Sequence, residues 1–331
     1  MTDVKGFILA AGFGTRLKPI TNTIPKPLVP FLGVKLVDFA IRQMSRSKRI
    51  SGLGANSHYL GDQIRHHFSK QRLFPSEIML SHENEILGTG GFVNPIRGWT
   101  KTSHLLVFNS DVVCDVSIDD VIRSHESAQN AVATMVLIPH QPGTTPVTCK
   151  DDRVVAFGDP NPKLSKWTFS GIHLLSPEFL KNIPGSGSPH IIDTYKELLQ
   201  KGARINYFHH QGTWLDLGDL RNYFQSTMEY LKDFSKIDSA FGISEIWRIQ
   251  GSKLKWIARE ESGVVGPSIV PLELELDSSL TIGPEVALYS EIEGKGPASP
   301  SRCISFSSAE GRKSRVASNS ICLDDVVIKI S

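Results

Sequence analysis

The segment from residue 9 to residue 27, LAAGFGTRLKPITNTIPKP, carries residue types that bind phosphate groups. Gly12 and Gly14 lack a Cβ atom, so the backbone can turn tightly there and bring its N–H groups close to anionic oxygens. Arg16 and Lys26 add positive charge, and a proline on each side of Lys26 restricts the backbone that presents it. The segment therefore predicts a site that holds phosphates.

Two common phosphate-binding motifs do not fit this segment. A Walker loop places four residues between its glycines and continues with Gly-Lys-Ser/Thr, whereas Phe13 alone separates Gly12 from Gly14. A dinucleotide-binding turn needs a third glycine at the position of Leu17. Because a Gly-x-Gly pair also occurs in ordinary strand-to-helix turns, the prediction depends on the basic residues that follow the glycines.

Two aspartates in apolar surroundings are candidates for a metal site. Asp111 follows the apolar run 105–108, and Asp216 lies within the sequence WLDLG, where an unpaired charge would be costly. Proteins commonly bind Mg²⁺ through one or two carboxylates together with substrate phosphates, whereas Zn²⁺ prefers His and Cys. The pair therefore predicts magnesium.

The elements that would position these residues alternate between strands and helices up to about residue 235. Apolar runs predict strands, and longer amphipathic patterns between them predict helices at 36–44, 60–68, 118–128 and 191–200. The expected strands are 7–10, 52–56, 78–80, 105–108, 131–138 and 205–208. This alternation predicts an α/β fold with a Rossmann-like, mostly parallel sheet flanked by helices, and with ligands at the carboxyl ends of the strands.

The C-terminal part has a different pattern, in which aliphatic residues recur every six positions. Six is the step of a hexapeptide β-helix, although an ordinary strand alternation such as that of residues 272–276 leaves a small β-sheet as an alternative. We expect a catalytic domain at 1–235, a linker at 236–262 and a β-helix-like domain at 263–331. The recurring residues are Val264, Val270, Leu276, Ile282 and Leu288, and then Val316, Cys322 and Ile328.

The composition excludes several classes of protein. The 331 residues carry a net charge of +2, which does not suggest a nucleic-acid surface. The apolar run near the N-terminus, residues 7–11, is too short for a signal peptide or a membrane span, so we expect a cytoplasmic protein. The four cysteines have no metal-binding spacing and are expected to be reduced thiols, with a disulfide left open: Cys114, Cys149, Cys303 and Cys322.

Taken together, the glycine-rich segment and the Pro-flanked lysine resemble those of the nucleotide-sugar pyrophosphorylases, which join a sugar 1-phosphate to a nucleoside triphosphate. The resemblance implies that Arg16 holds the leaving pyrophosphate and that Lys26 stabilises charge on the transferring phosphoryl group. It implies that Asp111 and Asp216, the latter in the W-x-D-x-G element of the family, bind Mg²⁺. The triphosphate would lie against Leu9, Ala10, Ala11, Gly12, Gly14 and Thr15.

Two further elements of this chain resemble substrate-binding elements of the family. The stretch 83–91 is similar to the E-x-x-LGTAG element that contacts the nucleotide base, which implies roles for Glu83, Gly88, Thr89 and Gly90. The stretch 169–172 is similar to the segment where the sugar lies, which implies roles for Ser170, Gly171 and also Asn109. The chain departs from the family pattern at Ser110, where Gly is usual, and at Gly90, where Ala is commoner.

The resemblance leaves the sugar and the base open. Relatives that use mannose or glucose 1-phosphate usually have Phe-x-Glu-Lys-Pro, but this chain has Phe157-Gly158-Asp159-Pro160. The lysine after Phe157 is missing, and Lys163 or Lys166 would have to replace it. This gap, the Gly90-Gly91 pair and the segment 56–60 resemble enzymes that uridylylate N-acetylmuramate 1-phosphate. The C-terminal pattern instead resembles the left-handed β-helix of mannose-1-phosphate guanylyltransferases, which we take as the first hypothesis.

The chemistry implied by the resemblance is in-line nucleotidyl transfer. A sugar-phosphate oxygen attacks the α-phosphorus, and because this oxygen is already anionic, no general base is needed. Histidines such as His58 and His173 are therefore expected to be structural. The expected partners are a nucleoside triphosphate and a sugar 1-phosphate, and the exposed ends of a β-helix could support a homo-oligomer.

Two alternative functions are weighed against nucleotidyl transfer. An acetyltransferase activity of the β-helix would normally need a histidine, yet all eleven histidines lie at or before His210. The alternative of another class is a non-catalytic regulatory or assembly subunit with a pyrophosphorylase-like fold. The combination of Arg16, Lys26, Asp111 and Asp216 disfavours that alternative, because a subunit without chemistry has no need of all four.

Overall fold

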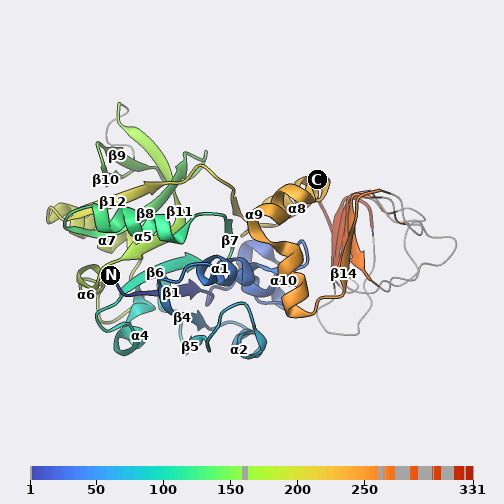
Figure 1. Cartoon of the computed structure of the whole chain (residues 1–331), viewed down its shortest axis with the longest axis horizontal. Coiled ribbons are helices and arrows are strands. Elements are labelled where there is room, and N and C mark those ends of the chain that lie inside the picture. The colour runs from blue at the N-terminus through green and yellow to red at the C-terminus, as the bar shows by residue number, and fades with distance from the viewer. Residues whose placement is uncertain are drawn as a thin grey trace. The chain divides into compact units, whose positions relative to one another are not determined.

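The computed structural model describes residues 2–158, 163–259, 264, 266–272, 284–289, 300, 302–306, 317–323 and 326–330 (Figure 1). The chain divides into two compact units, of which the first contains Met1–Phe13 and Ala40–Leu215. The second contains Gly14–Phe39 and Asp216–Ser331. Residues 14–39 therefore cluster with the C-terminal part, and the domain bounds expected from the sequence stay a prediction.

The first unit is built on a nine-stranded sheet with the order β5-β4-β1-β6-β11-β8-β12-β10-β9. Three of the predicted strands lie side by side in parallel at one end of this sheet, and a fourth, β6, continues it on the other side of β1. The strands are β1 (Val4–Leu9), β4 (Ile50–Ser57), β5 (Met79–His82), β6 (His104–Asn109), β8 (Ala131–Pro139), β9 (Val147–Lys150), β10 (Arg153–Phe157), β11 (Ser165–Leu175) and β12 (Arg204–His209). All six predicted strands are present among them.

The predicted helices are also present, with ends that differ by a few residues. They are α1 (Leu36–Ser45), α2 (Gly61–Lys70), α5 (Ile118–Ser127) and α7 (Ile191–Gln200). The structure adds α3 (Gly88–Gly91), α4 (Val93–Thr100) and α6 (Pro177–Lys181), together with a small sheet in which β7 (Val112–Cys114) pairs with β13 (Trp214–Asp216). Ser117 caps α5 and Ser176 caps α6, because each serine side chain accepts a hydrogen bond from a backbone N–H of the first turn.

The expectation of a mostly parallel sheet is wrong, because the sheet is mixed. β11 lies between β6 and β8 and is antiparallel to both, and β10 is antiparallel to β12 and β9. A parallel pair needs a crossover connection that is usually a helix, whereas the described residues between β8 and β11 contain strands and turns but no helix. The chain therefore returns through antiparallel neighbours in this half of the sheet.

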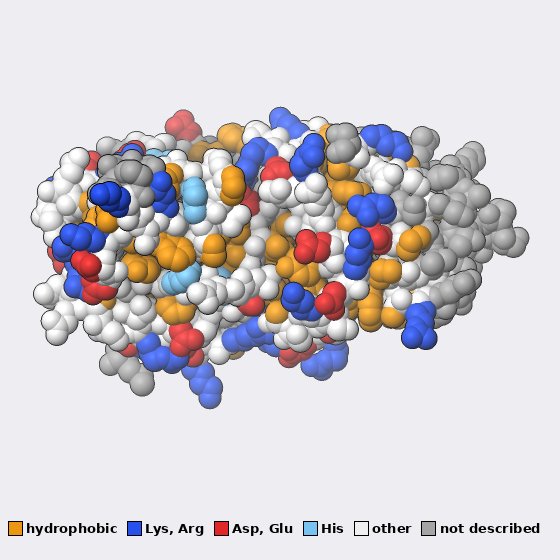
Figure 2. Space-filling model, turned by 90° about the horizontal axis from the view of Figure 1, so that it is seen from above, with side chains coloured by type: hydrophobic (Ala, Val, Ile, Leu, Met, Phe, Trp, Pro, Cys, Tyr) orange, Lys and Arg blue, Asp and Glu red, His pale blue; other side chains and the backbone are white. Residues whose placement is uncertain are grey.

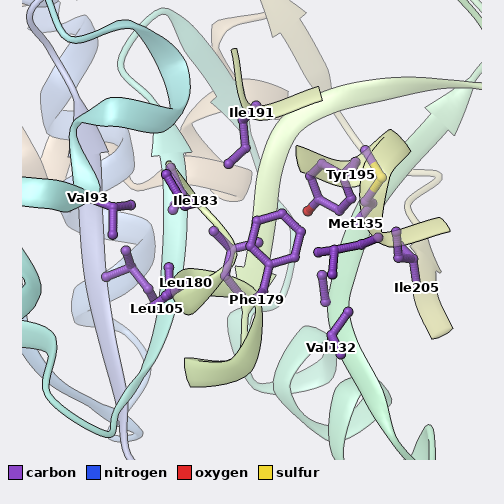
Figure 3. Packing of buried hydrophobic residues seen from close by; sticks show 14 of the residues in the cluster. Val93, Leu105, Val132, Met135, Phe179, Leu180, Ile183, Ile191, Tyr195 and Ile205 are labelled. Carbon is purple, nitrogen blue, oxygen red and sulfur yellow. The ribbon is translucent and has the colours of Figure 1, made fainter. Parts of the chain in front are cut away.

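A large apolar cluster joins the sheet of the first unit to its helices. Figure 3 shows side chains from α4, α6 and α7 meeting side chains from β6, β8 and β12. Phe179 and Tyr195 are fully buried in this cluster, with ring centroids 4.6 Å apart. Burial of such large side chains stabilises each by roughly 1.5–3 kcal/mol and holds the strand ends in place.

The second unit contains the N-terminal segment 14–39 and three helices from the C-terminal part. The helices are α8 (Leu220–Lys232), α9 (Phe234–Phe241) and α10 (Ile243–Gln250), and the segment forms η1 (Thr15–Leu17), η2 (Ile20–Asn22), η3 (Lys26–Leu28), β2 (Pro30–Phe31) and β3 (Val34–Lys35). The Tyr223 hydroxyl donates to the Pro30 carbonyl at 2.6 Å, and the Trp247 indole donates to the Leu32 carbonyl at 3.1 Å. The stretch expected as a linker, 236–262, thus contains most of α9, all of α10 and β14 (Leu254–Ile257).

The C-terminal part of the second unit is a six-stranded sheet with the order β14-β15-β16-β17-β18-β19. Its inner strands are parallel, and Ser268, Val286, Cys303 and Ser320 are successive register partners, so the step is 18 residues and then 17 twice. The outer strands β14 and β19 are antiparallel. The remaining strands are β15 (Ser268–Pro271), β16 (Val286–Leu288), β17 (Cys303–Phe306), β18 (Ser320–Leu323) and β19 (Val326–Lys329).

This step is three hexapeptides or one residue fewer, and it supports the β-helix that we propose for this part. Four of the recurring residues, Val264, Val270, Leu288 and Cys322, are buried in one apolar cluster, as their spacing predicts. Leu276, Ile282 and Val316 lie outside the described residues, and the handedness stays a prediction.

The four cysteines are buried free thiols, which agrees with the expectation from their spacing. Cys303 and Cys322 face each other with 4.0 Å between their sulfur atoms. No helix among the described residues is both long and apolar enough to cross a membrane. On the face seen in Figure 2, Lys and Arg side chains are interspersed with Asp and Glu, in line with the net charge of +2.

Candidate active site

The glycine-rich segment begins directly at the end of β1, as predicted. Ala10 and Ala11 are buried, whereas Gly12 is exposed and a Cβ atom built on it would have no neighbour within 4 Å. Gly14, the first residue of the second unit, has φ +64°, and its Cβ would come within 2.9 Å of Lys26 Cβ and of the Thr21 methyl group. Gly14 is therefore required by its backbone conformation and by close packing, and it lies beside Lys26.

Lys26 and Arg16 both belong to the second unit and differ in burial. Lys26 is half-buried at the start of η3, between the buried residues Pro25 and Pro27, while Arg16 is exposed in η1. The Pro25 carbonyl accepts a hydrogen bond from Leu28 N–H at 2.8 Å, which closes the turn around Lys26. The stiff presentation of Lys26 expected from its two prolines is thus supported by the local geometry.

The predicted metal ligand Asp111 lies just after β6, the strand next to β1. Asp111 is 7% exposed, and the preceding Ser110 donates its backbone N–H to the Leu9 carbonyl at 3.3 Å. The Ser110 hydroxyl is buried and has no hydrogen-bond partner among the described residues. A buried oxygen with unmet hydrogen-bonding capacity beside a buried carboxylate is suited to a bound cation or phosphate, so these residues fit Mg²⁺.

The second predicted ligand, Asp216, is the last residue of β13 and the first residue of the second unit. One of its carboxylate oxygens accepts a hydrogen bond from the backbone N–H of Gly218 at 2.9 Å. β13 pairs with β7, the strand that follows Asp111 directly. The metal-binding role of Asp216 stays a prediction.

The residues predicted to contact the sugar are brought together within the first unit. The register of β11 against β8 shifts between Phe169 and His173, and Gly171 in this bulge has φ +84°. A Cβ on Gly171 would come within 2.6 Å of the Asn109 amide nitrogen. The Ser170 carbonyl accepts a hydrogen bond from the Trp214 indole at 3.0 Å. Asn109, at the end of β6, thus lies together with Ser170 and Gly171 in the middle of β11.

The predicted base-binding turn packs closely against the segment that precedes α7. A Cβ on Gly88 or Gly90 would lie 3.0 Å and 2.9 Å from the carbonyl oxygens of Ser188 and Pro189, respectively. Gly90 N–H donates to the Pro189 carbonyl at 2.9 Å, and Thr89 Oγ1 accepts from Ile191 N–H at 3.1 Å. The glycine that replaces the usual alanine at position 90 therefore has a packing reason within this chain.

The missing lysine is not replaced at a matching position. Phe157 ends β10, and Asp159 and Pro160 lie outside the described residues. Lys163 is exposed, whereas the half-buried Lys166 lies in β11 as the register partner of Thr148.

Two of the histidines expected to be structural have hydrogen-bond contacts within the protein. His173 is fully buried, with 2.8 Å between its Nδ1 and the Tyr195 hydroxyl, and burial lowers the pKa of His173 to about 3. His58 places its Nδ1 2.8 Å from the Glu83 carbonyl. Their structural role stays a prediction.

Sequence reasoning missed a buried polar residue in this region. Asn56, at the carboxyl end of β4, is 4% exposed and contacts both the glycine-rich segment and Glu83 through hydrogen bonds. The available signal was an asparagine at the end of a predicted strand adjacent to β1, but its partners depend on strand order. Exposed Phe13, whose ring packs against those of His58 and Tyr59, was also not singled out as a site residue.

Comparison with known proteins places this chain among nucleotide-handling relatives. The pattern of a family described as "Nucleotidyl transferase" matches residues 5–233. Mannose-1-phosphate guanyltransferase beta-B of Xenopus laevis is 28% identical over 236 residues, which are 69% of this chain and 65% of that protein. UTP–glucose-1-phosphate uridylyltransferase of Synechocystis is 26% identical over 244 residues, or 67% of this chain and 62% of that protein. The chain therefore spans less than two thirds of the length of these relatives.

A solved structure shows the same fold. UDP-glucose pyrophosphorylase from Acinetobacter baumanii superimposes with a TM-score of 0.61 at 16% identity. The superposition covers 74% of this chain and 99% of that one. At this identity the likeness shows the fold of the covered part of the chain and does not indicate its substrates.

Proposed function

The chain belongs to the nucleotidyl transferase family, and from this premise we propose that it transfers a nucleotidyl group from a nucleoside triphosphate to a sugar 1-phosphate, releasing pyrophosphate. The observation that carries the proposal is the placement of the glycine-rich segment and of the Asn109–Asp111 stretch at the carboxyl ends of the parallel neighbours β1 and β6. Parallel strands of α/β sheets gather ligands at their carboxyl ends.

We propose mannose 1-phosphate and GTP as the substrates. The support comes from relatives named as mannose-1-phosphate guanyltransferases and from the C-terminal parallel strands with a step of 17 or 18 residues. A uridylyltransferase is the second candidate, because a relative named for UTP and glucose 1-phosphate is 26% identical and because the lysine after Phe157 is missing.

In this proposal the sugar-phosphate oxygen forms a bond to the α-phosphorus while the bond from that phosphorus to the β-phosphate oxygen breaks, and pyrophosphate leaves. Backbone N–H groups of residues 9–15 and the exposed Arg16 would hold the phosphates of the leaving group. Lys26, held between its prolines, would stabilise charge on the transferring group. Positioned donors and cations of this kind lower the barrier mainly through alignment and charge stabilisation.

Asn109, Ser170 and Gly171 would contact the sugar phosphate, and Gly88, Thr89 and Gly90 would lie near the base. The buried Asp111 and the half-buried Asp216 would hold Mg²⁺, which supplies positive charge to the phosphates when bound. Asp111 would orient its carboxylate from the rigid end of β6. The Ser110 hydroxyl, buried beside it, would find a hydrogen-bond partner in the bound complex.

The experiment measures pyrophosphate release by the purified protein with Mg²⁺ and a panel of substrate pairs. GTP, UTP, dTTP, CTP and ATP are each combined with mannose, glucose, N-acetylglucosamine and N-acetylmuramate 1-phosphates. We expect the highest kcat/KM with GTP and mannose 1-phosphate. A higher value with UTP and another sugar would replace the guanylyltransferase assignment with the uridylyltransferase. No release with any pair would contradict a transferase and favour a regulatory subunit.

A further inference from the structure

Three adjacent parallel strands end side by side at the predicted nucleotide site. β1 is followed by Ala10, β4 contains Asn56 one residue before its end, and β5 is followed by Glu83. Since β4 lies between β1 and β5, a side chain at the end of β4 can reach both neighbouring loops. The side chain of Asn56 does so.

A chain of hydrogen bonds crosses the three strand ends. Ala10 N–H donates to Asn56 Oδ1 at 2.6 Å, and Asn56 Nδ2 donates to Glu83 Oε1 at 2.7 Å. The other carboxylate oxygen of Glu83 accepts from Leu87 N–H at 2.9 Å. This series of hydrogen bonds therefore links the glycine-rich segment to Leu87, the residue before the 88–91 turn.

Each hydrogen bond in the chain has a fixed direction. The backbone N–H groups of Ala10 and Leu87 can only donate, so the atoms they contact must accept. The Asn56 side chain uses its carbonyl oxygen to accept from Ala10 and its NH₂ group to donate to the Glu83 carboxylate. Asn56 and Glu83 are 4% and 3% exposed, so water is largely excluded and an unmatched pair of atoms would be costly.

The backbone on either side is also held. Glu83 N–H donates to the Ser57 carbonyl at 2.8 Å, and the Glu83 carbonyl lies 2.8 Å from His58 Nδ1. The carboxylate of Glu83 is thus fixed from both ends, buried, and directed toward Asn56 and Leu87. Contact between this carboxylate and a nucleotide would require it to leave this arrangement.

We propose that Asn56 and Glu83 are positioning residues for nucleoside triphosphate binding, an inference that rests on the proposed function. The pair fixes the distance between the start of the glycine-rich segment, at Ala10, and the start of the 88–91 turn. Glu83 acts through Leu87 and Asn56 and does not touch the nucleotide. Because the pair acts before chemistry, it governs affinity for the nucleoside triphosphate more than the rate of the chemical step.

A swap of the two side chains tests the proposal. Asn56→Asp places two carboxylates against each other, and Glu83→Gln places an amide N–H against another donor. The double variant Asn56→Asp/Glu83→Gln restores the pattern, because the carboxylate at position 56 accepts from Ala10 and from the amide at position 83, whose carbonyl oxygen accepts from Leu87. The double variant keeps the net charge and nearly the same shape.

The readouts are the Kd of GTP by calorimetry, with UTP as the probe if the wild-type protein prefers it, and the KM and kcat of the reaction. An unmatched buried pair of atoms pushes the two loops apart, so each single variant is expected to raise Kd and KM for the nucleotide about tenfold. The KM for the sugar phosphate and kcat should change by less than about threefold. The double variant should return Kd to within about threefold of wild type.

Asn206→Asp is the matched control. Asn206 is 6% exposed in β12, and its amide donates to Thr134 and to Ser124. The same substitution there removes a buried donor in the same unit and should lower Tm without changing nucleotide affinity. The proposal is overturned if the single variants bind GTP like wild type, or if the double variant binds no better than the weaker single variant. Wild-type protein that binds GTP yet releases no pyrophosphate would count against the proposed function alone.

Discussion

Gly171 lies against the side chain of Asn109, with only 2.6 Å between the position that a Cβ would take and the Asn109 amide nitrogen. Asn109 ends β6, and Gly171 is the bulged residue of the antiparallel neighbour β11. The bulge therefore leaves room for one particular side chain. If Asn109 contacts the sugar phosphate as proposed, the size of residue 171 decides how well it is placed.

Gly171→Ala is expected to raise the KM for the sugar phosphate about tenfold or more, because a misplaced binding group loses much of its interaction. Gly202→Ala is the matched control: Gly202 has φ +79°, close to the +84° of Gly171, and open space around its Cβ position. Both variants should lose about 1–2 kcal/mol of stability from backbone strain. Steady-state kinetics and urea unfolding of the two variants separate strain from displacement of Asn109, and equal KM values would contradict the prediction.

Asp111→Asn is expected to lower kcat on the order of 100-fold or more while the protein stays folded, because a charge that organises the phosphates is lost. Thermal unfolding of the variant checks that the protein stays folded, because asparagine has nearly the same size and shape as aspartate. Asp152→Asn, which removes a surface ion pair with Arg204, serves as the control and should keep wild-type turnover. Wild-type turnover by Asp111→Asn would remove Asp111 from the site.

Gly90→Ala is expected to destabilise the first unit by about 1–3 kcal/mol, because the added methyl group would meet the Pro189 carbonyl at 2.9 Å. Gly98→Ala, in α4 with no neighbour within 4 Å of the new methyl group, should instead stabilise the protein by about 0.5–1 kcal/mol. Chemical unfolding of both variants measures the free energy of unfolding, which should fall in Gly90→Ala and rise in Gly98→Ala. An unchanged free energy of unfolding for Gly90→Ala would contradict the prediction and show that the 187–191 segment moves away from the new methyl group at little cost.

His173→Asn is expected to reduce the loss of stability in acid. Burial lowers the pKa of His173 to about 3, well below the value of about 6.5 for an exposed histidine, so the folded state favours the neutral ring. Its contribution is fully present above about pH 6.5 and is lost as the pH falls toward 3. His125, whose pKa burial lowers to about 4, adds to the acid sensitivity in both proteins.

Urea unfolding at pH 7 and pH 5 measures this effect. Replacement of His173 should shrink the difference between the two unfolding free energies by about 2 kcal/mol, because pH 5 is about 1.5 units below the unfolded pKa. His66→Asn, at an exposed position of α2, is the control and should keep the wild-type difference. An undiminished difference in His173→Asn would show that the ring is already protonated at pH 5.

The sequence predicted the parallel half of the sheet because strands such as 105–108 are buried on both faces and read as continuous apolar runs. It did not predict β11, whose middle contains Ser170 and Gly171 and which pairs with β6 and β8 far away in sequence. Its antiparallel insertion makes the sheet mixed. Local patterns report burial, whereas the neighbour of a strand depends on the path of the whole chain.

The candidate site was predictable to a similar extent. Gly14 and Asp111 could be proposed as site residues because glycine and carboxylate chemistry is visible in the sequence. Asn56 was not assigned, since its two hydrogen-bond partners lie 46 and 27 residues away and meet it only through the order of β1, β4 and β5. The role of the segment 14–39 within the second unit was hidden for the same reason.

The segment 14–39 forms hydrogen bonds with residues that are synthesised much later. Pro30 bonds to Tyr223, Leu32 to Trp247 and Asp38 to Gln250, across separations of 193, 215 and 212 residues. Since a chain leaves the ribosome from its N-terminus, the stretch that carries Arg16 and Lys26 is made early but must wait for helices made far later. A nascent chain that stops at residue 233, where the family match ends, has the segment with Arg16 and Lys26 but lacks Trp247 and Gln250, the partners in two of these three hydrogen bonds.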